Sequence, residues 1–340
     1  MTNYFIFRLL KGLFVIVLIS IATFIIMRLM PGDPTYLLLG EGNISISDEQ
    51  IEIIKAKWGL DRPLYEQYFV WASNLLRGDL GDSLVRIGVP VRQMIFEAIP
   101  VTLLLNLYAT VFALIVSIPL GILSALRRNS VLDYITSVGS ALGIATPNFW
   151  LALMLIVLFV LYIPAWLNAL AASAFIEWLP FVTEENVKAF SKATRLPPFG
   201  LKSWKGYILP VIVLATEQMA VFTRITRGAV LEVLPEDYVR TARSKGLGQR
   251  QIVWRHILAN ALLPIITVIG FRIAFILSGT IIVETVFALP GIGRLFTDSV
   301  FRLDYQVVQS LVVIFALLVV IINIITDFLY AVIDPRIRIS

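Results

Sequence analysis

The side chains best suited to binding a partner in this sequence lie in a polar, basic segment, residues 235–263. Glu236 and Asp237 open a short predicted helix, where carboxylates are favoured by the positive end of the helix dipole. Gly246 and Gly248 are predicted to end this helix, and a second helix follows. The resulting helical hairpin carries five basic side chains: Arg240, Arg243, Lys245, Arg250 and Arg255.

A helix, a glycine turn and a basic second helix could by themselves bind DNA as a helix-turn-helix. The flanks of the hairpin exclude that function. Residues 209–222 and 262–283 are strongly apolar, so they would hold the hairpin within a few residues of a bilayer, where it could hardly enter a major groove. We therefore expect no nucleic-acid partner. An alternative to a partner-binding hairpin is a solvated loop, whose basic residues only reflect the excess of positive charge in cytoplasmic loops of membrane proteins.

The other reactive side chains do not form a known catalytic motif. The one histidine, His256, lies in the hairpin, and neither a His-Glu-x-x-His nor a Gly-x-Ser-x-Gly motif is present. Cysteine is absent, which excludes disulfides and thiolate metal sites. The glycine-rich loop that cradles phosphates is also missing, since Gly-Leu-Lys-Ser at 200–203 lacks the glycine before its lysine. We expect no enzyme activity, no metal and no cofactor in this chain; ATP, if used, must bind another chain.

Long apolar segments must position the hairpin. Of the 340 residues, 58% are hydrophobic and only 15% are charged, which is typical of a polytopic membrane protein. The first apolar segment lacks a small-residue cleavage site and is predicted to be retained. We predict an all-α fold with about six membrane-spanning helices, the third interrupted by Pro147: 1–30, 99–125, 134–163, 204–222, 264–287 and 307–333.

Basic residues set the predicted orientation. Arg8 and Lys11 precede the first span and place the N terminus in the cytoplasm; after six spans the tail, 334–340, is cytoplasmic as well. The net charge of +5 is explained by such cytoplasmic flanks. Residues 31–98 then form an external helical region, and 164–205 form a second external stretch of unassigned role. One external helix is predicted at 63–76, with these side chains near one face: Tyr65, Tyr68, Phe69, Ala72 and Leu76.

The hairpin resembles the loop by which importer-type ABC transporter permeases engage their ATPase subunits. The family pattern is Glu-Ala-Ala, three residues, Gly, nine residues, Ile-x-Leu-Pro; Ala242, Gly246 and Leu258 match its second alanine, its glycine and its leucine. The chain departs from the pattern at Arg240, Thr241, His256 with Ile257, and Ala259. Residues 238–247 are similar to the variant in the first permease subunit of dipeptide and oligopeptide importers.

Six further segments resemble the same subfamily in order and spacing: 30–34, 59–63, 78–81, 145–150, 284–293 and 334–338. The resemblance implies a type I ABC importer permease fold with a small external helical cap, over a transmembrane domain at 99–333. It also implies a prokaryotic cell membrane, a second homologous permease subunit, an external substrate-binding protein and two cytoplasmic ATPases that bind ATP and Mg²⁺. Peptide is the expected solute; nickel, glutathione or oligosaccharide, and an ATP-independent secondary transporter, are the alternatives.

In this family the hairpin moves with the ATPases and opens the helix bundle. The residues that the resemblance assigns to coupling are Tyr238, Arg240, Ala242, Arg243, Gly246 and Leu258. In the first helix of the hairpin Tyr238, Val239 and Ala242 share an apolar face, which we expect to dock on the ATPase.

Two charged residues, Glu217 and Arg272, fall near the middle of predicted spans. A charge at membrane depth costs about 3 kcal/mol on insertion scales, so each should face the bundle interior, water or a partner. One hypothesis is that they pair, with each other or with a neighbouring subunit, and only hold helices together. The other is that they line the pathway, where opposite charges would suit a zwitterionic peptide. The sequence leaves both open.

Overall fold

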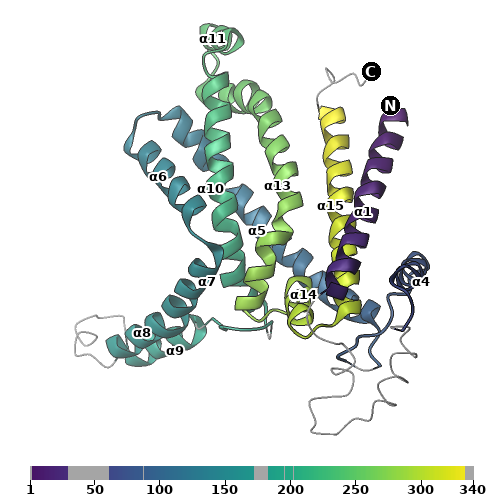
Figure 1. Ribbon diagram of the computed structural model, residues 1–340. Coiled ribbons are helices and arrows are strands. Elements are labelled where there is room, and N and C mark those ends of the chain that lie inside the picture. The colour runs from purple at the N-terminus through teal and green to yellow at the C-terminus, as the bar shows by residue number, and fades with distance from the viewer. Residues whose placement is uncertain are drawn as a thin grey trace. The chain divides into compact units, whose positions relative to one another are not determined.

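The computed structural model describes residues 2–29, 61–86, 88–171, 183–194, 196–201 and 203–333, and its regular structure there is helical (Figure 1). The all-α prediction is confirmed. The chain forms two compact units, residues 1–101 with 291–340 and residues 102–290. The predicted tail at 334–340 and residues 31–60 of the predicted external region lie outside the described residues.

The first unit is built around two long helices, α1 (Thr2–Leu29) and α15 (Tyr305–Ile333), which pack along each other. Two short helices, α4 (Leu64–Leu76) and α14 (Ile292–Phe301), pack beside them, and the beginning of α5 (Val91–Leu126) belongs to the same unit. Apolar side chains of α5, α14 and α15 form one buried cluster, among them Val91, Ile95, Ile292, Val307 and Leu311.

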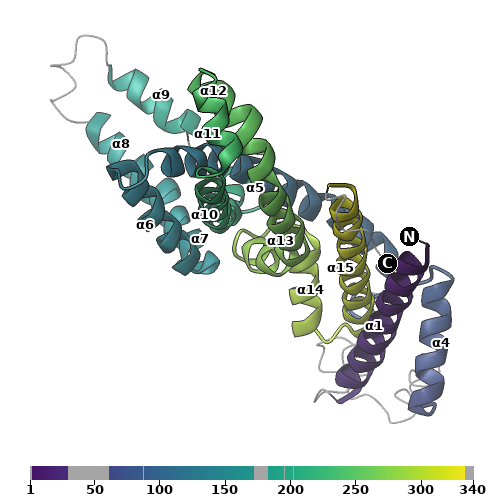
Figure 2. The same cartoon turned by 90° about the horizontal axis from the view of Figure 1, so that it is seen from above.

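The second unit contains the rest of α5 and the elements up to residue 290. In chain order these are α6 (Val131–Ala145), α7 (Asn148–Ile156), the π-helical turn η1 (Val157–Tyr162), α8 (Ile163–Ala171), α9 (Glu184–Thr194), η3 (Trp204–Tyr207), α10 (Ile208–Val233), α11 (Asp237–Ser244), α12 (Gln249–Ile252), the π-helical turn η4 (Val253–Ile257) and α13 (Leu258–Val286). Helix α10 is central, because it packs against α6, α7 and α13 (Figure 2). A Cβ at Gly143 of α6 would lie 2.8 Å from the Cβ of Ala220, so glycine permits this close approach of α6 to α10.

The long helices confirm a polytopic membrane protein. Among the described residues, five segments are long and apolar enough to cross a bilayer: Ile6–Leu29, Val91–Leu126, Asn148–Ala171, Trp204–Val233 and Tyr305–Ile325. Helix α13 covers the span predicted at 264–287; Arg272 and Glu284 are its only charged residues in the sequence.

Several helices extend beyond the spans that the sequence predicts. Helix α5 begins at Val91, inside the stretch predicted as external, and α10 continues to Val233. The third predicted span, 134–163, is divided into α6 and a second helical run that reaches Ala171. The division lies at Thr146 (φ −81°, ψ 118°), because the ring of Pro147 disfavours a helical conformation at the residue before it. The helix of η4 and α13 begins well before residue 264, so the hairpin joins α13 without a break.

Candidate functional site

The hairpin projects from the end of α10, and α11 lies beyond the end of that helix (Figure 1). Helix α11 ends in a Schellman arrangement, in which the Gly246 N–H donates to the Arg243 carbonyl at 3.0 Å and the Leu247 N–H donates to the Ala242 carbonyl at 3.3 Å. Gly246 has φ +75°, a left-handed conformation that favours glycine. Its predicted role as the helix stop is confirmed. Gly248 has φ −64° and only precedes α12, so it has no such role.

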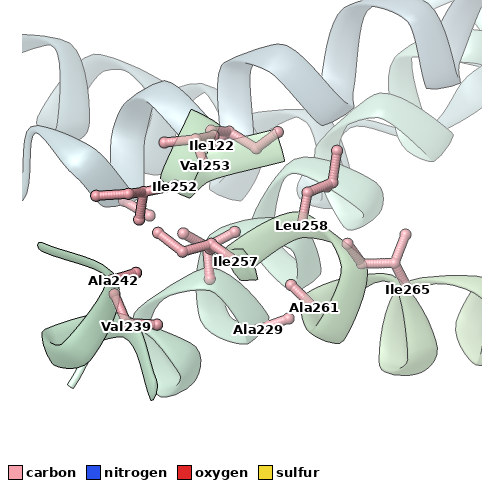
Figure 3. Packing of buried hydrophobic residues seen from close by; sticks show 12 residues of the cluster. Ile122, Ala229, Val239, Ala242, Ile252, Val253, Ile257, Leu258, Ala261 and Ile265 are labelled. Atoms are coloured by element: carbon pink, nitrogen blue, oxygen red, sulfur yellow. The ribbon is translucent and has the colours of Figure 1, made fainter. Parts of the chain in front are cut away.

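The hairpin has an apolar core of its own (Figure 3). Val239 and Ala242 of α11, 0% and 4% exposed, belong to one cluster with Ile252 and Ile257 of the second arm. The cluster continues into α5, α10 and α13, through Ile122, Ala229, Val230, Leu258, Ala261 and Ile265. The hairpin is therefore a packed extension of the second unit. A solvated loop would not bury these side chains.

This core corrects the predicted docking face. Val239 and Ala242 point into the chain's own packing, so they cannot also contact a partner, and Leu258 is buried in the same cluster. Of the predicted apolar face only Tyr238 is exposed, at 40%. Burial and the nearby Glu236 carboxylate raise the pKa of Tyr238 above its ordinary value, while a hydrogen bond with Asn260 acts in the opposite direction. The phenol is thus neutral at neutral pH and can donate a hydrogen bond.

The exposed surface of the hairpin is basic and contains two large aromatic side chains, Tyr238 and Trp254. Trp254 is 62% exposed and lies in η4, whose π-helical turn alternates outward Trp254 with buried Val253 and Ile257. The basic residues predicted for the hairpin are exposed as well: Arg240, Arg243, Lys245, Arg250 and Arg255. Arg240 lies 3.6 Å from Asp237, but both side chains are largely in solvent, so this pair contributes little. The sequence reasoning missed Trp254, although a tryptophan between two arginines of a polar segment was a usable signal.

A buried ion pair fixes the part of α10 that leads to the hairpin. Asp133, in the first turn of α6, accepts two hydrogen bonds from Arg227 of α10, at 2.6 Å (Nε) and 3.0 Å (Nη2). The same carboxylate accepts two further hydrogen bonds, from the Ser124 hydroxyl at 2.5 Å and from the Asn129 backbone N–H at 3.0 Å. Because Asp133 is 5% exposed and fully hydrogen-bonded, the pair locks the turn between α5 and α6 onto α10. Asp133 and Arg227 are 94 residues apart, so no local pattern in the sequence links them.

Polar side chains also meet inside the predicted spans. Glu217 of α10 accepts a hydrogen bond from the Asn148 amide of α7 at 3.2 Å. Glu284 of α13 is fully buried and accepts from the Thr102 hydroxyl of α5 at 2.5 Å. The side chain of Arg272 lies outside the described residues. The pathway role of Glu217 and Arg272 stays a prediction, and the contact with Asn148 shows that Glu217 also has a helix-joining partner.

Comparisons with known proteins cover almost the whole chain. The family described as "binding-protein-dependent transport system inner membrane component" matches residues 117–339. A second family, the N-terminal part of such membrane components, matches residues 1–105.

Three curated relatives are similar over nearly their full lengths. The oligopeptide transport system permease protein AppB of Bacillus subtilis (strain 168) is 41% identical over 339 residues, which cover 99% of this chain and 100% of that protein. The dipeptide transport system permease protein DppB of Escherichia coli (strain K12) is 38% identical over 326 residues, 94% of each chain. The glutathione transport system permease protein GsiC of the same strain is 36% identical over 338 residues, 99% of each chain.

A solved structure has the same fold. A chain of the methionine ABC transporter MetNI, in an inward-facing conformation, aligns with a TM-score of 0.52 and 15% identity, covering 71% of this chain and 97% of that chain. At this identity the likeness shows the fold alone, and it confirms the predicted type I importer architecture.

Proposed function

Because the chain belongs to the family of inner-membrane components of binding-protein-dependent transport systems, we propose that it is one half of the membrane pathway of an ATP-driven peptide importer. The function is that of a permease subunit, as in the oligopeptide and dipeptide systems that it resembles along nearly its whole length. The proposed partners are a second homologous permease subunit, two cytoplasmic ATPases that bind ATP and Mg²⁺, and an external substrate-binding protein.

The observation that carries this proposal is the packed hairpin with an exposed basic and aromatic surface. An interface needs a rigid support, and the buried cluster that joins Val239 and Ala242 to α10 and α13 provides one. Force applied to the hairpin would pass into α10, which packs against three other helices of its unit. The ATPase-coupling role thus belongs to two groups: exposed residues that contact the partner, such as Tyr238, and buried ones that hold them.

Reconstitution tests the transport function. Proteoliposomes that contain both permease subunits and both ATPases should take up labelled peptides only with internal ATP and external binding protein. Competition with unlabelled dipeptides, longer peptides, glutathione, an oligosaccharide and Ni²⁺ identifies the solute class, and peptides should compete most strongly. Uptake without the ATPases would favour a secondary transporter; competition only by Ni²⁺ or an oligosaccharide would overturn the peptide assignment.

Trp254→Ala is expected to weaken binding of the ATPase by a factor of about 30 or more, because a tryptophan anchor at the centre of an interface contributes about 2 kcal/mol or more. The measurement is the affinity of purified ATPase for the permease pair in nanodiscs. Gln251→Ala, which changes a neighbouring exposed polar side chain, is the control and should have little effect. Equal affinities for the two variants would place Trp254 outside the interface.

Impermeant thiol reagents should establish the orientation, since the chain has no cysteine to give a background. We propose that both termini are cytoplasmic, which puts the exposed Glu185 of α9 outside and the exposed Ser244 of α11 inside. Glu185→Cys should react in intact cells, and Ser244→Cys should react only after permeabilisation. Reaction of Ser244→Cys in intact cells would reverse the orientation and separate the hairpin from any cytoplasmic ATPase.

A further inference from the structure

The short helix α4 crosses α1 near the end of α1 that lies farthest from the N terminus. Three side chains of α4 contact three successive turns of α1: Gln67 meets Arg28, Trp71 meets Phe24 and Tyr68 meets Ser20. The Arg28 Nε donates to the Gln67 side-chain oxygen at 3.0 Å, and the hydroxyls of Tyr68 and Ser20 lie 2.9 Å apart. The rings of Trp71 and Phe24 have their centres 6.3 Å apart.

These contacts define which side of α4 points along α1. Successive residues of a helix are turned by about 100°, so Gln67, Trp71 and Tyr68 follow one another around α4 in steps of about 40–60°. Their partners follow one another down α1, from its end at Arg28 inward to Ser20. Continuing around α4 in the same sense reaches three further residues on the side opposite Gln67: Tyr65, Leu76 and Phe69. Figure 1 shows the crossing, with α4 seen nearly end-on beside the upright α1.

The three residues on that side are large, apolar and exposed. Tyr65, Phe69 and Leu76 are 64%, 67% and 88% exposed, while Tyr68 and Trp71 pack against α1. The predicted single face of this helix is therefore divided between a packed part and an exposed part. Of the five exposed large apolar side chains of α4, these three lie on one side, whereas Leu64 and Val70, 56% and 47% exposed, lie elsewhere around the helix. Three such side chains on one side of a helix mark a surface that lipid or a partner protein covers.

The depth at which α4 contacts α1 indicates that lipid covers this side of α4. Ser20 lies within the membrane-spanning segment Ile6–Leu29, nine residues before its end, which corresponds to about 13 Å along the helix. The exposed side of α4 points further along α1, toward the middle of this segment. Near this side of α4, the surface of α1 exposes apolar side chains such as Ile21 and Ile25. Within a membrane-spanning segment these side chains can only face lipid or another span. The ring of Phe69 lies 5.8 Å from that of Tyr68, whose hydroxyl meets Ser20, so acyl chains that contact this part of α1 reach Phe69 as well.

We infer that α4 is an interfacial helix that rests in the membrane leaflet at the far end of α1, with Tyr65, Phe69 and Leu76 among lipid acyl chains. With the proposed cytoplasmic N terminus this is the outer leaflet. The helix was predicted as part of an external cap; its contacts with Ser20 and Phe24 place it lower, at the depth of interfacial helices, about 5–10 Å into the boundary between headgroups and acyl chains. It anchors α1 and α15 laterally, through the cluster of Phe24, Trp71 and Val313.

Nitroxide labels on single cysteines test this inference in the assembled complex, in nanodiscs of phosphatidylethanolamine and phosphatidylglycerol. Phe69→Cys and Leu76→Cys are the test positions, Ile25→Cys of α1 is the membrane reference, and Glu66→Cys on the polar side of α4 is the matched control. At the test positions collisions with O₂ should exceed those with a water-soluble nickel chelate, as at Ile25→Cys. At Glu66→Cys collisions with the nickel chelate should exceed those with O₂. The depth from the collision ratio should be about 5–10 Å.

Two results would overturn the inference. Strong collisions with the nickel chelate at Phe69→Cys and Leu76→Cys would place α4 in water, as an external cap. Low collisions with both reagents would show that protein, and not lipid, covers this side. Neither result depends on transport, so a complex that fails to carry peptides but has lipid-immersed labels would contradict the proposed function and leave α4 in the membrane.

Discussion

Asp133→Asn is expected to destabilise the permease by about 2 kcal/mol, because it replaces the charge-assisted hydrogen bonds of the Arg227 guanidinium with weaker ones to a neutral amide. The side chain of Asp133 is 6% exposed but that of Arg227 is 29% exposed, so the expected effect lies below the range for breaking a fully buried ion pair. The amide keeps one acceptor oxygen, so the turn between α5 and α6 would also lose one of its two hydrogen bonds to this side chain, from the Ser124 hydroxyl or from the Asn129 backbone N–H.

The measurement is the fraction of complex that stays assembled after heating in detergent. Arg240→Gln is the control, because it removes a solvent-exposed pair that is worth at most about 1 kcal/mol. The double variant Asp133→Asn with Arg227→Gln should recover part of the loss, since no unpaired charge then remains. Equal stability of Asp133→Asn and Arg240→Gln would contradict the structural role of the pair.

Ala242→Asp is expected to disrupt the hairpin and abolish coupling. Ala242 is 4% exposed within the cluster that includes Val239 and Ile257, so an ionised carboxylate there has no polar partner and costs several kcal/mol. The membrane spans should still insert, because the change lies outside them. Solute-stimulated ATP hydrolysis should fall to the level without permease, and trypsin should cleave the basic hairpin faster in inside-out vesicles.

Thr241→Asp is the matched control for this variant. It introduces the same charge one residue away, where the side chain is exposed, and should leave cleavage by trypsin unchanged. Comparing the two separates the effect of burial from the effect of negative charge on a basic surface. Normal stimulation of ATP hydrolysis in Ala242→Asp would remove the packed core of the hairpin from the coupling mechanism.

The sequence alone determined the class of protein and its general plan. Apolar segments of 20 or more residues can be buried only in a bilayer, whatever their tertiary partners, so the membrane-spanning helices were predictable from composition and length. The stop at Gly246 was equally local, because a left-handed residue at a helix end favours glycine in any context. The hairpin could be recognised for the same reason, as a helix, a glycine and a second helix between apolar segments.

Only the tertiary structure decided which side chains are inside and which are outside. Periodicity placed Tyr238, Val239 and Ala242 on one face of α11, but it could not show that the covering surface comes from the second arm of the hairpin and from α10. The outward position of Trp254 depends on the π-helical turn, which shifts the helical period locally. Pro147 indicated a break, but how far each helix extends beyond it depended on packing.

Contacts between residues far apart in the chain could not be predicted from the sequence, for a simpler reason. Asp133 and Arg227 are 94 residues apart, and Thr102 and Glu284 are 182 apart, so no local pattern links them. Likewise, the pattern of α4 showed an amphipathic helix, whereas its depth follows from its contacts with Ser20 and Phe24 of α1. Local preferences act along the chain, but burial and pairing are set by whichever elements the whole fold brings together.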